Sequence, residues 1–213
     1  MDYIPNTNLK LMQDPDHFKM TSDSIHLGQF MKIKHNESVL DIGTNNGVLL
    51  MMASQFSQNT LIGIDINEAA LDLARQNATL NGLSNLDYIK STVQNYRDRI
   101  FDVILCNPPY YKQASSVAKT QSNARFDLDL SYSDLFRSVF ELLKDKGRLY
   151  IIIPIERLQE AFVLMEQYHL TAKRSCFIHH NRNHDAHAVL IEAHKFGLNH
   201  MIVEAPIFNK ESS

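Results

Sequence analysis

Short apolar runs alternate with longer amphipathic segments through most of this chain, and this alternation restricts the folds open to it. Four runs are rich in leucine, isoleucine and valine, as buried parallel strands are: residues 38–43, 60–65, 101–107 and 148–154. Between the second and third, residues 67–82 carry apolar side chains at helical spacing, with Asn67 as a cap and Gly82 as a stop. The pattern predicts an α/β domain.

The second half of the chain continues this alternation. Residues 133–147 and 156–169 have the apolar spacing of helices, and Gly147 is expected to end the first of them. Residues 172–180 and 186–197 have strand character, and we expect them to pair as a hairpin that completes the sheet.

Composition excludes several classes of protein. With 44% hydrophobic and 21% charged residues, 213 residues suffice for one compact domain. A net charge of −3 argues against a protein that binds nucleic acid non-specifically over its whole surface. A local basic patch is still compatible with this net charge. No apolar run approaches a membrane span, and the N-terminus lacks a secretion signal, so we expect a cytoplasmic protein. Cys106 and Cys176 are expected to be free, buried and inert.

The stretch "VLDIGTNNG" places glycines after a strand and before a helix, where the backbone can approach a ligand closely. Asn45 and Val48 stand where a dinucleotide-binding fingerprint has its second and third glycines, so that fingerprint fails. What remains is Asp41 with Gly43 and Gly47, and the two glycines are expected to clear space for the amino-acid part of a cofactor. The alternative is a plain strand-to-helix turn.

Asp65 ends the next apolar run, where an acidic side chain can accept hydrogen bonds from two ribose hydroxyls. The alternative is that Asp65 or Asn67 caps the following helix. Both roles are compatible if one residue caps while the other binds.

The stretch "CNPPYYK" must end its strand, because proline donates no backbone hydrogen bond and holds the preceding residue extended. Asn107 is thereby left at the tip, on a stiff backbone beside an aromatic ring. Such an arrangement suits the recognition of a flat polar group. The alternative is an ordinary β-turn whose tyrosine packs on the core.

Taken together, "DIGTNNG", "GIDINEAALDLARQNATLNG" and "FDVILCNPPYY" resemble the class I S-adenosylmethionine-dependent methyltransferases with an Asn-Pro-Pro-Tyr motif. The segments "KMTSDSIHLGQF" and "AHAVLIEAHKFG" add similarity to the bacterial tRNA(Val) adenine-N6 methyltransferases. This resemblance implies a Rossmann-like sheet of seven mostly parallel strands, the last antiparallel, with helices on both faces. It also implies one domain over 1–213, with a cap segment at 1–35 and a catalytic core at 36–200.

The resemblance further implies S-adenosyl-L-methionine as cofactor and adenosine 37 in the anticodon loop of a tRNA, tRNA(Val), as substrate. We expect no DNA or membrane partner; the sequence does not set the oligomeric state, for which a monomer and a weak dimer are both open. The Asn107 side-chain oxygen and the Pro108 carbonyl would accept the two amine hydrogens of adenine, while Tyr110 stacks on the base. The implied cofactor contacts are Asp41, Gly43, Asn45, Gly47, Asp65, Ile66, Thr92 and Asn107. Thr92 stands where many family members carry an aspartate.

Further substrate contacts are expected from polar segments on either side of the predicted hairpin and after the proline motif. The candidates are Tyr110, Tyr111, Lys112, Arg125, Lys173, Arg174 and Arg182. Histidines 180, 184 and 187 have a spacing that zinc could use, but the absence of a nearby cysteine or acidic ligand favours a polar rim without metal. At the start of the predicted helix after residue 20, Ser22 or Asp23 is expected to cap, and Asp23 is a weak site candidate.

Other functions share these motifs. The same turn can hold a glutamine amide, as in release-factor methyltransferases, or a guanine N2 amine of ribosomal RNA. The former enzymes carry an N-terminal helical domain for which no room is expected here, and DNA adenine methyltransferases need a target-recognition segment. A non-enzymatic alternative is an RNA-binding protein that has lost cofactor affinity through Asn45 and Thr92.

Overall fold

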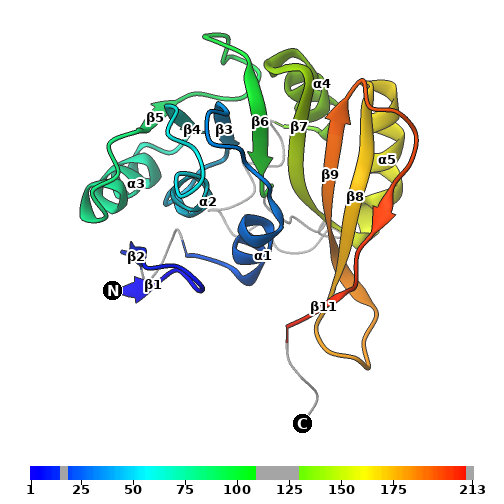
Figure 1. Cartoon of the computed structure of the whole chain (residues 1–213), viewed down its shortest axis with the longest axis horizontal. Helices are drawn as coiled ribbons and strands as arrows, with labels where there is room; N and C mark the ends of the chain where they lie inside the picture. The colour runs from blue at the N-terminus through cyan, green and yellow to red at the C-terminus, as the bar shows by residue number, and fades with distance from the viewer. Residues whose placement is uncertain (15–18, 109–129, 210–213) are drawn as a thin grey trace, which may run out of the picture.

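The computed structural model describes residues 1–14, 19–108 and 130–209 (Figure 1). Its main sheet contains seven long or central strands, in the spatial order β5-β4-β3-β6-β7-β9-β8. They are β3 (Val39–Ile42), β4 (Leu61–Asp65), β5 (Leu86–Lys90), β6 (Phe101–Cys106), β7 (Leu143–Pro154), β8 (Leu170–His179) and β9 (Ala186–Lys195). Only β9 among these runs antiparallel to its neighbours, β7 and β8. The predicted mostly parallel sheet with its last long strand antiparallel is confirmed, but the sheet has nine strands in the described residues, not seven.

Two short strands continue this sheet past residue 200. β10 (Ile202–Val203) and β11 (Ile207–Phe208) both pair parallel with β8, on the side away from β9. Near the N-terminus, β1 (Asp2–Tyr3) and β2 (Lys10–Leu11) form a separate antiparallel pair. Its backbone reaches α3 (Glu68–Leu80) through the side chain of Asn81.

Helices cover both faces of the sheet, as predicted. On one face, α1 (Ser22–Phe30), α2 (Val48–Ala53) and α3 contribute to one buried cluster. On the other face, α4 (Tyr132–Leu142) and α5 (Leu158–Gln167) contribute to a second; a short 3-10 turn, η1 (Ile155–Arg157), leads into α5. None of the helices in the described part of the chain is long and apolar enough to cross a membrane.

Local signals set most helix ends. Asn67 caps α3 by accepting the amides of Ala69 and Ala70, and Gly82 takes a left-handed conformation just beyond the helix. The predicted end of α4 at Gly147 is wrong. The helix ends at Leu142 because Leu143 already pairs with Phe101 as the start of β7.

The start of α1 also differs from expectation. Thr21, not Ser22 or Asp23, is the cap: its hydroxyl accepts the amide of Ser24 at 3.2 Å. The predicted hairpin is present, since β8 and β9 pair along nearly their whole lengths.

Candidate active site

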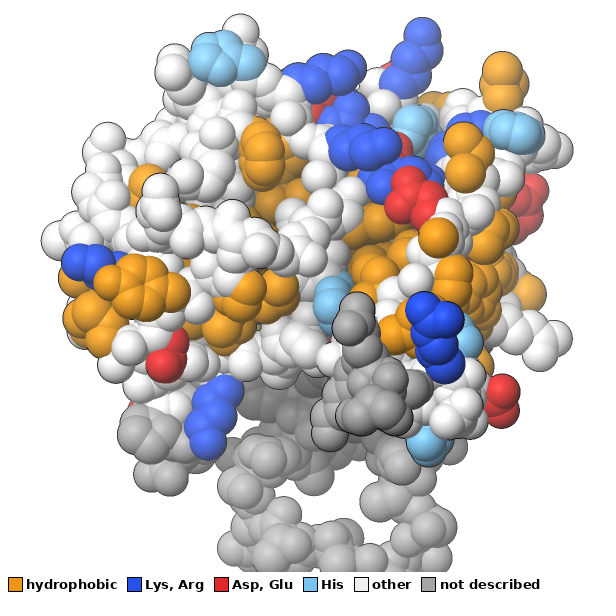
Figure 2. Space-filling model, turned by 60° about the horizontal axis from the view of Figure 1, so that its bottom comes forward, with side chains coloured by type: hydrophobic (Ala, Val, Ile, Leu, Met, Phe, Trp, Pro, Cys, Tyr) orange, Lys and Arg blue, Asp and Glu red, His pale blue; other side chains and the backbone are white. Residues whose placement is uncertain are grey.

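Several chemically important residues meet at the carboxyl edge of the parallel strands. β3 lies between β4 and β6, so Ile42 is level with both Ile64 and Cys106. Backbone bonds join the turns beyond these strands: the amide of Thr44 donates to Ile64, and the amide of Ser91 donates to Asp65, each at 3.0 Å. This edge, toward which Figure 2 turns the molecule, is where open α/β sheets bind ligands.

The loop after β3 is held open by three residues with positive φ: Gly43 (69°), Asn45 (51°) and Gly47 (82°). A Cβ on Gly43 would meet no described atom within 4 Å, so the backbone there faces open space. A Cβ on Gly47 would lie 2.6 Å from the Tyr88 hydroxyl oxygen. Gly43 therefore provides room for a ligand, whereas Gly47 is required by packing, which refines the prediction that both clear space.

Asp41 lies beneath this loop and is only 1% exposed. Its Oδ2 accepts the Thr44 hydroxyl at 2.7 Å, but its Oδ1 has no hydrogen-bond donor among the described residues. Burial raises the pKa of Asp41 to about 7; the Thr44 bond opposes the rise and the charge of Asp65 adds to it. A buried carboxylate with an open oxygen favours a cationic ligand.

Asp65 ends β4 and organises the same loop. Its two oxygens accept the amides of Asn45 (3.0 Å) and Asn67 (2.9 Å). Burial raises the pKa of Asp65, and these backbone bonds oppose the rise. Since Asn67 caps α3, Asp65 is not needed as a cap, and each of its oxygens keeps a lone pair for a further donor.

Further polar atoms along this edge lack partners in the described part of the chain. Buried Asn45 Oδ1, Thr92 Oγ1 and the Tyr88 hydroxyl make no hydrogen bond there. Ile66, by contrast, is an apolar side chain left 40% exposed immediately after Asp65. Unpaired buried polar atoms are costly, so their concentration here indicates a place built for a polar ligand.

Asn107 stands at the tip of β6, and its amide Nδ2 donates to the Ser24 hydroxyl of α1 at 2.9 Å. Ser24 also contacts the Thr21 hydroxyl at 3.1 Å. This pairing engages the amide nitrogen, so Oδ1 is the side-chain atom of Asn107 that can accept a hydrogen bond. Ser24 was missed in the sequence, where 83 residues separate it from Asn107 and no local signal links them.

Some of the remaining candidates belong to the described residues and others do not. The structure describes Pro108, which is partly buried, and Lys173, Arg174 and Arg182. Outside the described residues lie Tyr110, Tyr111, Lys112 and Arg125.

Arg174 contradicts its prediction as a phosphate contact. It is 7% exposed, donates to Glu192 (2.8 Å) and Glu204 (3.0 Å), and lies over the ring of Phe30. With its charge neutralised inside the sheet, it is a structural residue.

Lys173 is half-buried and Arg182 is exposed, and the two lie in different places. Lys173 donates to the Leu198 carbonyl beside β8, and Arg182 belongs to the turn between β8 and β9. In the same turn region, the rings of His180 and His187 stack with centroids 4.1 Å apart. Among the described residues, no three His, Cys, Asp or Glu side chains form a group that could hold a metal ion.

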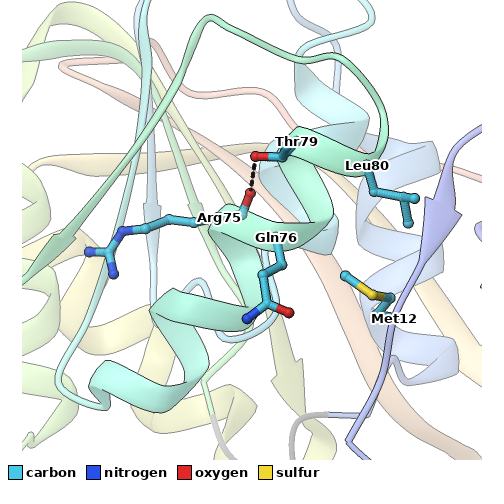
Figure 3. Close-up of a pocket in the computed structure, with 5 residues that line it drawn as sticks. All are labelled: Met12, Arg75, Gln76, Thr79 and Leu80. Atoms are coloured by element: carbon cyan, nitrogen blue, oxygen red, sulfur yellow. Dashed lines mark hydrogen bonds between the residues drawn. The ribbon is translucent and has the colours of Figure 1, made fainter.

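A hollow of ≈ 430 Å³ between α3 and residue 12 is a poor candidate (Figure 3). It is lined by Met12, Gln76, Thr79, Leu80 and Arg75, and Arg75 already donates to Glu68, Asp72 and the Tyr88 carbonyl. The carboxyl edge offers open polar atoms and this hollow does not.

Comparisons with known proteins give the family of the chain. Residues 33–194 match the family model described as "Methyltransferase domain". The chain is 32% identical over 162 residues to a protein of Bacteroides thetaiotaomicron named tRNA1(Val) (adenine(37)-N6)-methyltransferase; the match covers 73% of this chain and 68% of that protein. It is 30% identical over 157 residues to a protein of the same name from Shewanella halifaxensis, covering 71% of this chain and 64% of that protein. The chain thus spans about two thirds of the length of these relatives.

Solved structures show the same fold at low identity. A predicted O-methyltransferase of Agrobacterium tumefaciens superposes with a TM-score of 0.70 at 16% identity, covering 89% of this chain and 88% of that one. A methyltransferase of Pyrococcus furiosus gives a TM-score of 0.67 at 19% identity, with 90% and 91% coverage.

S-adenosyl-L-methionine is the cofactor of this class, and the described residues fit it. If it binds at this edge, Asp41 would offer a carboxylate to its ammonium group, Gly43 would leave space, and Asp65 and Thr92 would offer acceptors for hydroxyls and an amine. The matched family, the unpaired polar atoms at the carboxyl edge and the strand order are all consistent with a class I methyltransferase. The chain therefore belongs to the methyltransferase-domain family and is a relative of the tRNA1(Val) (adenine(37)-N6)-methyltransferases.

Proposed function

We propose that this protein transfers a methyl group from S-adenosyl-L-methionine to the N6 amine of adenosine 37 in a tRNA, in the anticodon loop, within the cytoplasm. The observation that carries the proposal is the orientation of Asn107, which donates its amide to Ser24 and keeps Oδ1 as an acceptor beside the cofactor edge. The names of the related proteins support the choice of nucleoside.

The chemistry requires positioning more than a strong base. The cofactor supplies an activated methyl group, whereas the adenine amine is a weak nucleophile because its lone pair is delocalised into the ring. Asn107 Oδ1 and the Pro108 carbonyl are assigned to the two amine hydrogens, which directs the lone pair toward the methyl group. Tyr110 is assigned to stacking on the base, which an anticodon loop offers without breaking a duplex.

The test is incubation with radiolabelled S-adenosyl-L-methionine and unmodified bulk tRNA, followed by nucleoside analysis. Label in N6-methyladenosine is the expected result, and its loss from a tRNA with guanosine at position 37 would identify the position. Label in another nucleoside, such as N2-methylguanosine, would retain the methyltransferase and overturn the substrate. Absence of cofactor binding in calorimetry would favour an RNA-binding protein without catalysis.

A further inference from the structure

A second hollow lies on the face of the sheet covered by α1, beyond the helix's carboxyl end. Its volume is ≈ 470 Å³, and the residues that matter are cationic or aromatic: Lys32, Lys34, Arg148, His194, Phe56 and Tyr150. We call this hollow the basic groove. Lys and Arg side chains gather on the face shown in Figure 2.

The groove's excess positive charge comes from its lysines. Glu192, the carboxylate that lines it, is already paired with Arg174 and His194, and Glu37 nearby is paired with Arg148. Lys32 forms no ion pair with any described residue, and Lys34, whose side chain is 79% exposed, lies 3.9 Å from Glu37. Lys32 is therefore left for an external anion, and Lys34, held only by a long and exposed ion pair, can turn to the same anion.

The groove's walls are rigid, as a binding surface requires. The Arg148 guanidinium and the Tyr150 hydroxyl both donate to the Lys32 carbonyl, at 2.9 and 3.1 Å, which fixes the segment after α1 against β7. Arg148 Nε is a buried donor with no acceptor among the described residues.

α1 connects this groove to the active site. Ser24, in its first turn, holds Asn107, and Lys32 follows its last residue by two positions. A helix of nine residues is about 13 Å long. An RNA stem whose loop enters the active site can therefore pass along α1, where Ser22 and Gln29 are exposed, and reach the basic groove with its backbone.

We infer that the basic groove binds phosphates of the stem that carries the methylated loop, so that Lys32 and Lys34 anchor the RNA. This inference rests on the proposed function and deepens it, because it assigns a stem contact separate from base recognition. Phosphate contacts position a nucleic acid and make its binding dependent on salt.

The experiment compares a Lys32→Ala/Lys34→Ala variant with a Lys10→Ala/Lys146→Ala control, which removes the same charge from exposed positions outside the groove. Fluorescence anisotropy measures binding of an anticodon stem-loop and of the loop oligonucleotide alone, each from 50 to 200 mM salt. The groove variant should bind the stem-loop about 3- to 10-fold more weakly, with a salt slope reduced by about one to two. Loop binding, cofactor affinity and the control should stay unchanged.

Unchanged stem-loop affinity and slope would overturn the inference, as would equal weakening of loop binding. So would a wild-type protein that binds neither RNA. Failure of the proposed function would give another result. No tRNA would be methylated, but the groove substitutions would still reduce the salt dependence of stem-loop binding.

Discussion

Two buried carboxylates in one row of the sheet, Asp41 on β3 and Glu192 on β9, have opposite pKa shifts. Asp41 is 1% exposed and Glu192 is 9% exposed. Burial raises the pKa of Asp41 to about 7, whereas hydrogen bonds from His194 and Arg174 overcome the effect of burial and lower that of Glu192 to about 2. The difference lies in their partners: no described Lys, Arg or His forms an ion pair with Asp41. We call the surroundings of Glu192 the completed site, because the chain itself supplies the cations there. The surroundings of Asp41, at the carboxyl edge, are the open site, because a ligand must supply the positive charge.

The largest effect is expected at the completed site. Arg174→Met should lower the free energy of unfolding by about 3–5 kcal/mol, because it leaves Glu204 without its cation and buried Glu192 with His194 alone. Denaturant unfolding measures this loss. The control is Arg137→Met on α4, where the pair with Asp134 is exposed and should contribute less than about 1 kcal/mol. Equal losses in both variants would remove the distinction between the two kinds of pair.

The next largest effect is expected at the open site. Asn107→Ala should slow methylation about 100- to 1,000-fold, because an acceptor that orients the amine is lost. The cofactor dissociation constant and the melting temperature should stay close to wild type. Single-turnover kinetics and calorimetry measure both, and Asn199→Ala, an exposed asparagine, serves as control. Parallel loss of cofactor binding and rate would contradict the assigned role.

The Asp41→Asn variant should change cofactor binding and protein stability in opposite directions. We expect cofactor affinity to fall about 10- to 100-fold, because the ammonium group loses a charged partner. Without cofactor, the same variant should be more stable than wild type at pH 8, since it removes an uncompensated buried charge. Calorimetry and thermal unfolding give the two values. A variant that loses both affinity and stability would indicate a purely structural Asp41.

The pH dependence follows from the same carboxyl group. Its folded pKa of about 7 exceeds the ordinary 3.8, so its contribution to stability is present below 3.8 and is lost as pH rises toward 7. Cofactor affinity should change in the opposite direction and weaken about tenfold between pH 8 and pH 6, where Asp41 becomes protonated. The Asp41→Asn variant should lose both of these pH dependences, that of stability and that of cofactor affinity. Glu192 provides the contrast, because its stabilisation is lost only as pH falls from 4.5 toward 2.

The smallest effect is expected at the residue that orients Asn107. Ser24→Ala should slow methylation about 3- to 10-fold, the equivalent of one neutral hydrogen bond. Ser24→Thr, which keeps the hydroxyl, should restore part of the rate. If both variants match wild type, Asn107 needs no support from α1.

Sequence reasoning succeeded where the signal is local. The alternation of runs predicted the sheet, and Asn67 and Gly82 predicted the ends of α3, because capping and turn preferences act within a few residues. The same local signals predicted the turn at Gly43 and Gly47, which both have positive φ. All the cofactor contacts, Asp41, Gly43, Thr92 and Ile66 among them, remain predictions.

It failed where distant segments decide the outcome. Arg174 was assigned to phosphate because the run around it does not indicate that Glu192 and Glu204 lie beside it. Ser24 was overlooked because its partner is 83 residues away. The end of α4 was misplaced because pairing of Leu143 with Phe101 overrode the preference of a glycine.

The position of β9 has a consequence for how the chain acquires its structure. β9 is the last long strand made, yet it lies between β7 and β8 (Figure 1). Until residues 186–195 leave the ribosome, β8 has no neighbour through which to join the sheet, and β7 presents an unpaired apolar edge. The final third of the sheet must therefore assemble late and together. The growing chain passes through a stage at which its unpaired strands are open to aggregation.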